Sequence, residues 1–408
     1  QIAGDCQELN TEKPEVYNYV LEAYEQYMKM GVDAFRIDTV KHISRLTMNN
    51  AFIPGFSAYA KSIGKKNFFM YGEVCCRVSE VVNHGVSQVS PFYYTWKPEK
   101  SYTWNNESVD GKDNLVMAEK EYDDHKGWKP SKSDNAKLDG NNYHDPDYTL
   151  SSGLGVIDYA MHFNFESANK AFDIGKQEDD YMNDSTYNVV YVDSHDYGPA
   201  INGNDSNRYG QGTEAWAENL DLMFTFRGIP CLYYGSEIEF QKDVKIDAGN
   251  SKPLAETGRA YIEGTVNTTD FGVYNGATGA MAKTLNSTLA KHLQTLNRIR
   301  RVVPALQKGQ YSTEGCNGNM AYKRRYVDKT NSIDSYVLVA ISGGCTFNDV
   351  LKGKYVDLVT GQEYDGNSGT ITVENIGKAN MRVLVYQNPT AEAYGAAGKV
   401  GEGSIYLK

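Results

Sequence analysis

The sequence has no apolar run long enough to cross a bilayer, so it predicts no membrane-spanning helix. It also lacks a Gly-rich phosphate loop, an HExxH metal motif and an internal repeat. No signal peptide is visible, but the chain begins at Gln1 without Met, so this absence excludes nothing. Basic residues are outnumbered, since 41 Lys and Arg against 52 Asp and Glu give a formal net charge of −11. This charge argues against nucleic acid or anionic membranes as partners and favours a neutral or cationic substrate.

Cysteine is scarce. The 408-residue chain has six cysteines, with neither a CxxC pair nor zinc-ligand spacing. A chain of this length can bury a large core without disulfides. We therefore expect buried thiols, with a bridge between Cys316 and Cys345 as the alternative. The other four are Cys6, Cys75, Cys76 and Cys231.

Tyrosine, by contrast, is abundant, with 31 residues. Flat amphipathic rings stack on the C–H faces of sugars. The composition is therefore compatible with sugar binding, although a tyrosine-rich surface is also found in some secreted bacterial proteins.

Helix and strand patterns alternate over residues 13–302. Segments with the apolar spacing of amphipathic helices alternate with short apolar segments typical of strands, which is the pattern of a parallel α/β fold. From about residue 308 short alternating segments separated by Gly, Asn and Asp predict an antiparallel β domain. The expected helices are 13–30, 46–62, 164–175, 214–226 and 285–302, and the expected strands are 32–38, 67–74, 154–161, 185–194 and 228–235.

A polar excursion over residues 97–150 interrupts this rhythm, and loops of this length are usually functional or flexible. Large aromatic residues lie near or within it. They could stack on glucose rings, but packing is the expected fate of most of them, because large aromatics are usually well buried. These residues are Tyr93, Tyr94, Trp96, Trp104 and Trp128.

The segment VDAFRID ends the strand expected over 32–38. Alternate side chains of a strand share a face, so Arg36 and Asp38 lie on one side and Phe35 and Ile37 on the other. A buried Arg and Asp on a parallel strand are costly unless they are paired or used. The guanidinium would keep Asp38 ionised, which is the state that a nucleophile needs. A purely structural ion pair is the alternative.

Two more strands end in acidic residues. Glu73 ends the apolar strand 67–74, at the end where parallel α/β barrels place their chemistry. Partial burial there would raise its pKa and keep a proton available; a plain surface-loop residue is the alternative. His195 and Asp196 follow the strand 185–194, where a capping Asp beside a solvated His is the alternative. Retaining glycosidases need two carboxyl groups about 5–5.5 Å apart, and a third can stabilise an oxocarbenium-like transition state.

Five segments resemble, in the correct order, conserved regions of glycoside hydrolase family 13, the α-amylase family. Each motif is moderately specific, whereas the ordered set is highly specific. The resemblance implies a (β/α)8 TIM barrel, with its N-terminal strands missing from this chain, followed by an antiparallel β-sandwich domain. The segments are CQELN (6–10), GVDAFRIDTVKH (31–42), FFMYGEV (68–74), VVYVDSHD (189–196) and GIPCLYYGSE (228–237).

The resemblance also implies roles for the matching residues. Asp38 would be the nucleophile, Glu73 the acid/base and Asp196 the transition-state stabiliser. Arg36 would orient Asp38, and His195 would bind sugar hydroxyls.

Three further residues are candidate substrate contacts by the same resemblance. Lys41 and His42 match the pair usually found in members that act on α-1,4 bonds. The backbone carbonyl of His42 would also bind a structural calcium ion. Tyr197 follows Asp196 where many members have Asn, and this departure leaves the neighbouring subsite undefined.

The resemblance divides the chain into four parts. Because the family's earliest motif is absent and a barrel cannot close on five strands, we expect three strands upstream of Gln1 or in another chain. The parts are the end of an inserted domain B before the third barrel helix (1–12), the C-terminal part of the barrel (13–305), the β domain (306–388), and a linker or the start of a further module (389–408).

The expected function is retaining endo-hydrolysis of α-1,4-glucosidic bonds in starch-like α-glucans, by a secreted extracellular or cell-surface enzyme of bacterial type. A transglycosylase, a cyclodextrinase or an α-glucosidase of the same family is the alternative. A catalytically inactive glucan-binding protein is a remote alternative, because such relatives typically lose a carboxylate and all three are retained.

Overall fold

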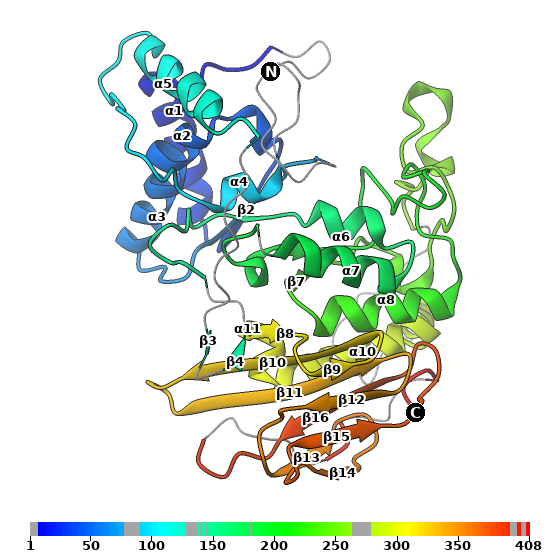
Figure 1. The fold of residues 1–408 in the computed structure, drawn as a ribbon. Coiled ribbons are helices and arrows are strands. Elements are labelled where there is room, and N and C mark those ends of the chain that lie inside the picture. Colours follow the sequence, from blue (N-terminus) through cyan, green and yellow to red (C-terminus); the bar gives the residue numbers. More distant parts are fainter. Residues whose placement is uncertain are drawn as a thin grey trace. The chain divides into compact units, whose positions relative to one another are not determined.

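The computed structural model contains two compact units (Figure 1). It describes residues 7–76, 90–127, 137–138, 141–142, 146–179, 181–262, 279–391, 398–400 and 405–408. The first unit comprises Gln1–Ala136, Asp145–Tyr159 and Gln177–Val189, and the second comprises Lys137–His144, Ala160–Lys176 and Val190–Lys408.

A parallel three-stranded sheet in the order β1–β2–β5 lies at the centre of the first unit. Its register places Ile37 opposite Gly72 and Tyr71 opposite Gly155, so the carboxyl ends of the strands meet at one edge. Among the described residues β1 pairs only with β2 and is therefore an edge strand. The strands are β1 (Ala34–Ile37), β2 (Phe69–Gly72) and β5 (Gly155–Val156).

Two helices cover one face of this sheet. Tyr17 and Leu21 recur at helical spacing on α1 and are buried. The helix approaches α3 so closely that a Cβ atom at Gly55 would lie 2.8 Å from Leu21 Cδ2, so a side chain there would displace Leu21. The ring of Phe35 on β1 meets Phe56 of α3 edge-on at 5.2 Å. The helices are α1 (Pro14–Lys29) and α3 (Ile53–Ser62), preceded by α2 (Arg45–Thr47) and the π-helical turn η2 (Met48–Phe52).

A buried ion pair anchors the excursion that follows Glu73. Arg45 Nε donates to Glu121 Oε1 at 2.9 Å, and the Tyr93 hydroxyl donates to Glu121 Oε2. The guanidinium carbon also lies 3.8 Å from the centroid of the Tyr93 ring. Arg45, Glu121 and Tyr93 are fully buried, so these contacts satisfy charges that water does not reach. The pair connects α2 to α5 (Lys112–Asp124) and to α4 (Pro91–Thr95).

The aromatic residues near this excursion are mostly in the core, as predicted. Tyr93, Tyr94 and Trp96 are buried. Trp104 packs against Tyr17 with ring centroids 6.2 Å apart. Trp128 lies outside the described residues.

A β-sandwich occupies much of the second unit. A six-stranded antiparallel sheet in the order β14–β13–β16–β11–β10–β8 packs on a three-stranded sheet in the order β15–β12–β9. The strands are β8 (Gln310–Ser312), β9 (Cys316–Asn317), β10 (Met320–Asp328), β11 (Ile333–Ile341), β12 (Cys345–Asn348), β13 (Lys354–Asp357), β14 (Glu363–Asp365), β15 (Thr370–Val373) and β16 (Met381–Tyr386).

Strand β11 shows how the larger sheet is buried on both faces. Tyr336 and Leu338 pack in the cluster shared with the smaller sheet, whereas Val337 and Val339 pack in a cluster with helical residues such as Leu293. Alternation of side chains along a strand produces this division. Figure 1 shows α10 and α11 beside the sheet. The helices of this layer are α8 (Thr213–Thr225), α10 (Thr288–Val302) and α11 (Pro304–Lys308).

Three predicted strands are wrong over most of their length, and one of them, the segment 228–235, forms only β7. The segment 154–161 forms only β5 and then turns into α6, because its later apolar residues are buried on a helix. The segment 185–194 forms only β6, because the Asp184 carboxylate accepts the Thr186 N–H at 3.0 Å and starts a 3₁₀ turn. The remaining elements are η1 (Val40–His42), β3 (Lys137–Leu138), β4 (Asn141–Asn142), α6 (Tyr159–Asn164), α7 (Ala168–Asp179), η3 (Ser185–Tyr187), β6 (Val189–Val190), β7 (Ile229–Pro230), η4 (Ser236–Ile238), η5 (Gly249–Ser251), η6 (Leu254–Glu256) and α9 (Gly279–Leu285).

The expected fold class is borne out at a coarser level. Parallel strands alternate with helices in the first unit, and the strands from β8 to β16 are antiparallel in every registered pair. The parallel strands do not close into a barrel within the described ranges. The domain boundaries at residues 12, 305 and 388 remain predictions.

No helix in the described part of the chain is both long and apolar enough to span a membrane.

Candidate active site

The carboxyl edge of the parallel sheet carries two of the predicted acids. Asp38 follows the last residue of β1, and Glu73 follows the last residue of β2. The pairing of Ile37 with Gly72 continues past the strand ends, because the Glu73 N–H donates to the Ile37 carbonyl at 2.8 Å. Backbone pairing between neighbouring strands thus brings the two acids to the same edge.

Arg36 joins these two carboxylates. Its Nη1 lies 3.1 Å from Asp38 Oδ1, and its Nη2 donates to Glu73 Oε2 at 2.8 Å. One planar guanidinium therefore contacts both acids, which is the fork geometry that arginine offers to carboxylates.

The burial of the three groups differs from the prediction in one respect. Glu73 is only 8% exposed, as expected. Arg36 and Asp38 were expected to be buried, but their side chains are 30% and 67% exposed. The reason is the edge position of β1, which leaves its polar face open in the described part of the chain.

Lys41 and His42 lie on the turn after β1. Lys41 Nζ donates to the Cys75 carbonyl at 3.2 Å, which connects this turn to the segment after Glu73. His42 Nδ1 lies 2.7 Å from Glu8 Oε1.

The predicted calcium ligand in this turn is the backbone carbonyl of His42. Calcium takes six to eight oxygen ligands. His42 Nδ1 contacts the Glu8 carboxylate, and in the described ranges no group of three His, Cys, Asp or Glu side chains is arranged so that it could hold a metal ion. Calcium binding by the His42 carbonyl stays a prediction, and no chemical step is assigned to it.

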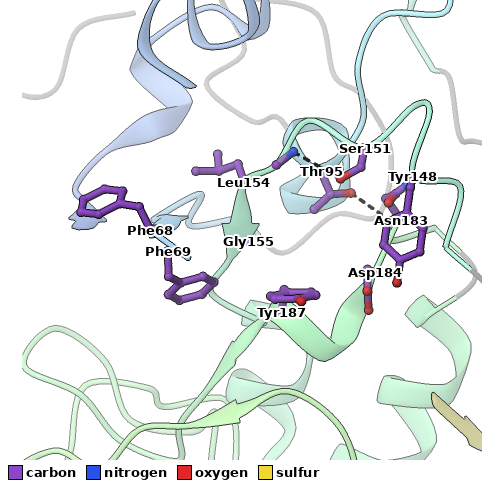
Figure 2. Close-up of a pocket in the computed structure, with 11 residues that line it drawn as sticks. Phe68, Phe69, Thr95, Tyr148, Ser151, Leu154, Gly155, Asn183, Asp184 and Tyr187 are labelled. Carbon is purple, nitrogen blue, oxygen red and sulfur yellow. Dashed lines mark hydrogen bonds between the residues drawn. The ribbon is translucent and has the colours of Figure 1, made fainter. Parts of the chain in front are cut away.

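Two cavities of about 280 Å³ lie in the first unit. One is lined by Arg36 and Asp38 together with apolar residues that include Tyr24 and Phe35. The other lies at the amino ends of β2 and β5, where Figure 2 shows the rings of Phe69 and Tyr187 facing it. The second cavity contains none of the predicted site residues.

The third acid lies in the second unit, in the loop after β6. Asp196 Oδ2 is 3.0 Å from His195 Nε2, and its Oδ1 accepts from Arg259 Nη2 at 2.8 Å. The loop is shaped by Ser194, whose hydroxyl oxygen accepts the N–H groups of Asp196 and Tyr197, each at 3.1 Å.

Tyr197 packs against another ring. Its ring meets that of Phe163 edge-on at 5.8 Å, and its carbonyl accepts the Ser194 N–H at 2.9 Å. These contacts hold the turn together, and a role of Tyr197 in substrate binding stays a prediction.

The structure thus assembles two groups of predicted residues. Arg36, Asp38 and Glu73 are in contact in the first unit, and His195 and Asp196 are in contact in the second. That all three acids surround a single sugar ring remains a prediction.

Sequence reasoning missed the arginines of the second unit. Arg259 contacts Asp196 from 63 positions away in the sequence, and buried Arg208 donates to buried Asp193 at 3.1 Å. Both arginines lie in segments without regular secondary structure, so no periodicity in the sequence marks them.

Two acids joined by one arginine at the carboxyl edge of a parallel α/β sheet are compatible with the active site of a glycoside hydrolase. Residues 2–270 match the family model of the α-amylase catalytic domain. The chain therefore belongs to the α-amylase family, glycoside hydrolase family 13.

Individual relatives are more distant. The chain is 25% identical over 259 residues to a cyclomaltodextrin glucanotransferase of Klebsiella oxytoca. This match covers 56% of this chain and 30% of that protein. It is 35% identical over 82 residues to an α-amylase of Streptomyces lividans, which covers 20% of this chain and 9% of that protein.

A solved α-amylase from Geobacillus thermoleovorans, in complex with acarbose, has a similar fold. Its TM-score is 0.52 at 16% identity, with 93% of this chain and 66% of that one covered. The chain thus spans less than two thirds of the length of each of these relatives.

Proposed function

We propose that the protein hydrolyses α-1,4-glucosidic bonds within starch-like α-glucans with retention of configuration. The observation that carries this proposal is the contact of the Arg36 guanidinium with both Asp38 and Glu73 at the edge of adjacent strands. Neighbouring strands lie about 4.8 Å apart, which is compatible with the separation of about 5–5.5 Å that a retaining mechanism needs.

In the proposed first step Asp38 attacks the anomeric carbon, and Glu73 donates its proton to the leaving glycosidic oxygen. The bond from the anomeric carbon to this oxygen breaks as the bond to Asp38 forms. In the second step Glu73 takes a proton from water, and the water oxygen displaces Asp38.

The surroundings of the acids support this division of roles. Glu73 is almost completely buried, and the hydrogen bond from Arg36 fixes the orientation of its carboxyl group. Asp38 is two-thirds exposed beside Arg36, where a substrate can reach it. Asp196, held between His195 and Arg259, is assigned to electrostatic stabilisation of the oxocarbenium-like transition state.

The test is Asp38→Asn in the complete enzyme. We expect the rate of amylose hydrolysis to fall by several orders of magnitude, because the amide cannot form the glycosyl ester, while the fold and sugar binding persist. Glu73→Gln serves as a matched comparison. With a good leaving group, as in maltosyl fluoride, the first step needs no proton from residue 73, so the rate of that step should recover in this variant. Near-wild-type hydrolysis by Asp38→Asn would remove Asp38 from this role.

Glucan transfer is the second candidate, because one of the curated relatives is a cyclomaltodextrin glucanotransferase. Transfer shares the covalent intermediate and differs only in the acceptor. Products from amylose, pullulan and cyclodextrin separate the possibilities. Linear oligosaccharides from amylose support hydrolysis, cyclic products support transfer, and rapid opening of cyclodextrin supports a cyclodextrinase.

An α-glucosidase would instead release glucose from chain ends, and a glucan-binding protein without activity would release nothing. An extracellular or cell-surface location belongs to the same proposal, and fractionation of the native host, followed by immunodetection, would test it.

A further inference from the structure

Arg259 makes three directed contacts in the second unit. Its Nη2 donates to Asp196 Oδ1 at 2.8 Å, its Nη1 to Asp247 Oδ2 at 2.8 Å and its Nε to the His195 carbonyl at 2.6 Å. The side chain therefore holds both the carboxylate of Asp196 and the backbone of the residue before it. Such a fork fixes orientation as well as charge.

Arg259 is itself fixed. Its backbone N–H donates to Thr257 Oγ1 at 3.2 Å, and its carbonyl accepts from the Tyr234 hydroxyl at 2.9 Å. The guanidinium is 32% exposed, so these contacts are made at the surface of a loop rather than in the core.

Both oxygens of Asp196 have a nitrogen partner. Arg259 contacts Oδ1, and His195 Nε2 lies 3.0 Å from Oδ2. A carboxylate held at both oxygens has one orientation, and a group that stabilises a developing positive charge must keep its orientation throughout the reaction.

The charges of this cluster suit that task. A guanidinium favours the ionised form of a nearby carboxylate. Arg259 divides its charge between Asp196 and Asp247, so it does not neutralise Asp196 alone.

We propose that Arg259 is a positioning residue that holds the carboxylate of Asp196 oriented toward the substrate. This inference rests on the proposed function, because it assigns Arg259 an effect only through Asp196. A purely structural role, in which Arg259 fastens one loop to another, would affect stability but not the chemical step.

The experiment is Arg259→Ala in the complete enzyme, assayed on a maltooligosaccharide. We expect kcat to fall on the order of 100-fold, as when one preorganised donor is removed, with KM changed much less. Millimolar guanidinium chloride should restore part of kcat, because the ion can occupy the vacated space, whereas the same concentration of sodium chloride should not. Arg259→Lys keeps the charge but cannot make three contacts, and should give an intermediate kcat.

Arg325→Ala is the matched control. Arg325 contacts Asp334 through Nε and Nη2 at 2.9 and 2.8 Å in the β10–β11 hairpin, away from the predicted site residues in the sequence. Its removal should lower the melting temperature, leave kcat unchanged and give no rescue by guanidinium.

Two variants separate this inference from the proposed function. If Asp196→Asn keeps the wild-type kcat, the proposed role of Asp196 fails. The positioning role alone is overturned by either of two results obtained together with an inactive Asp196→Asn variant. In the first, Arg259→Ala keeps the wild-type kcat. In the second, Arg259→Ala has a lower kcat that guanidinium does not restore. The double variant should be no slower than Asp196→Asn alone, because Arg259 acts through that acid.

Discussion

Arg36 and Arg259 each contact a carboxylate assigned to catalysis, but the two units position them differently. Arg36 lies on the strand that ends just before Asp38, and it reaches Glu73, which follows the last residue of the neighbouring strand. Arg259 lies in a loop and divides its contacts between Asp196 and Asp247. The geometry of the first cluster follows from backbone pairing, whereas that of the second depends on a network of side chains. We therefore expect substitutions to affect the two clusters unequally.

The largest effect is expected from Arg36→Ala. Its guanidinium contacts two of the proposed catalytic carboxylates, so kcat should fall about 1000-fold or more, compared with the smaller loss from Arg259→Ala. Steady-state kinetics of both variants on one maltooligosaccharide provides the measurement. A greater loss from Arg259→Ala would reverse the comparison.

The two units can also be compared by how a buried acid in each one affects the free energy of unfolding. Glu121 of the first unit is paired with Arg45, which keeps its charge at every working pH. Glu121→Gln should lower the free energy of unfolding by roughly 3 to 5 kcal/mol, because it removes the buried carboxylate that is paired with the Arg45 guanidinium. Denaturant unfolding followed by circular dichroism measures this loss.

Lys120→Met on the same helix is the control for Glu121→Gln. Lys120 forms an exposed pair with Asp124 at 3.0 Å, so its removal should change stability very little. Equal unfolding midpoints for the two variants would contradict a special role for the buried pair.

The smallest effect is expected in the second unit, where buried Asp221 lies 2.8 Å from His292. Burial raises the pKa of Asp221 from 3.8 to about 6, and His292 opposes this shift. Because the folded-state pKa is the higher one, the contribution of Asp221 to stability is fully present below pH 4 and is lost as the pH rises through 6.

Asp221→Asn removes this titration. The free energy of unfolding of the wild type should therefore fall relative to the variant between about pH 4 and 6, by at most about 3 kcal/mol. Thermal or denaturant unfolding at several pH values tests the difference. A difference that is independent of pH in this range would exclude Asp221 as the titrating group.

The first cluster could be predicted from the sequence because Arg36, Asp38 and Glu73 lie within or just beyond short strands. Alternation along a strand and the common edge of parallel strands are enough to bring such residues together. Arg259 and Asp247 could not be predicted, because their loops lack periodicity and their approach to Asp196 depends on tertiary structure.

The errors in the fold have a related cause. The segment 154–161 was expected to be a strand, but Tyr159 and Met161 are buried on α6. A short apolar run is compatible with a buried strand and with a buried helix, so periodicity alone does not separate them. The exposure of Arg36 and Asp38 was missed because composition does not reveal which strand lies at the edge of a sheet.

The burial of β11 on both faces has a consequence for modularity. The same cluster joins Val337 and Val339 of the sheet to Leu293 of α10, and Arg324 on β10 donates to the Thr225 and Leu306 carbonyls at 3.3 and 2.6 Å. If recombination replaced the sandwich with an unrelated domain, the apolar face of the helices would become exposed. The Thr225 and Leu306 carbonyls would also lose their hydrogen bonds from Arg324. The sandwich and these helices should therefore be inherited as one piece.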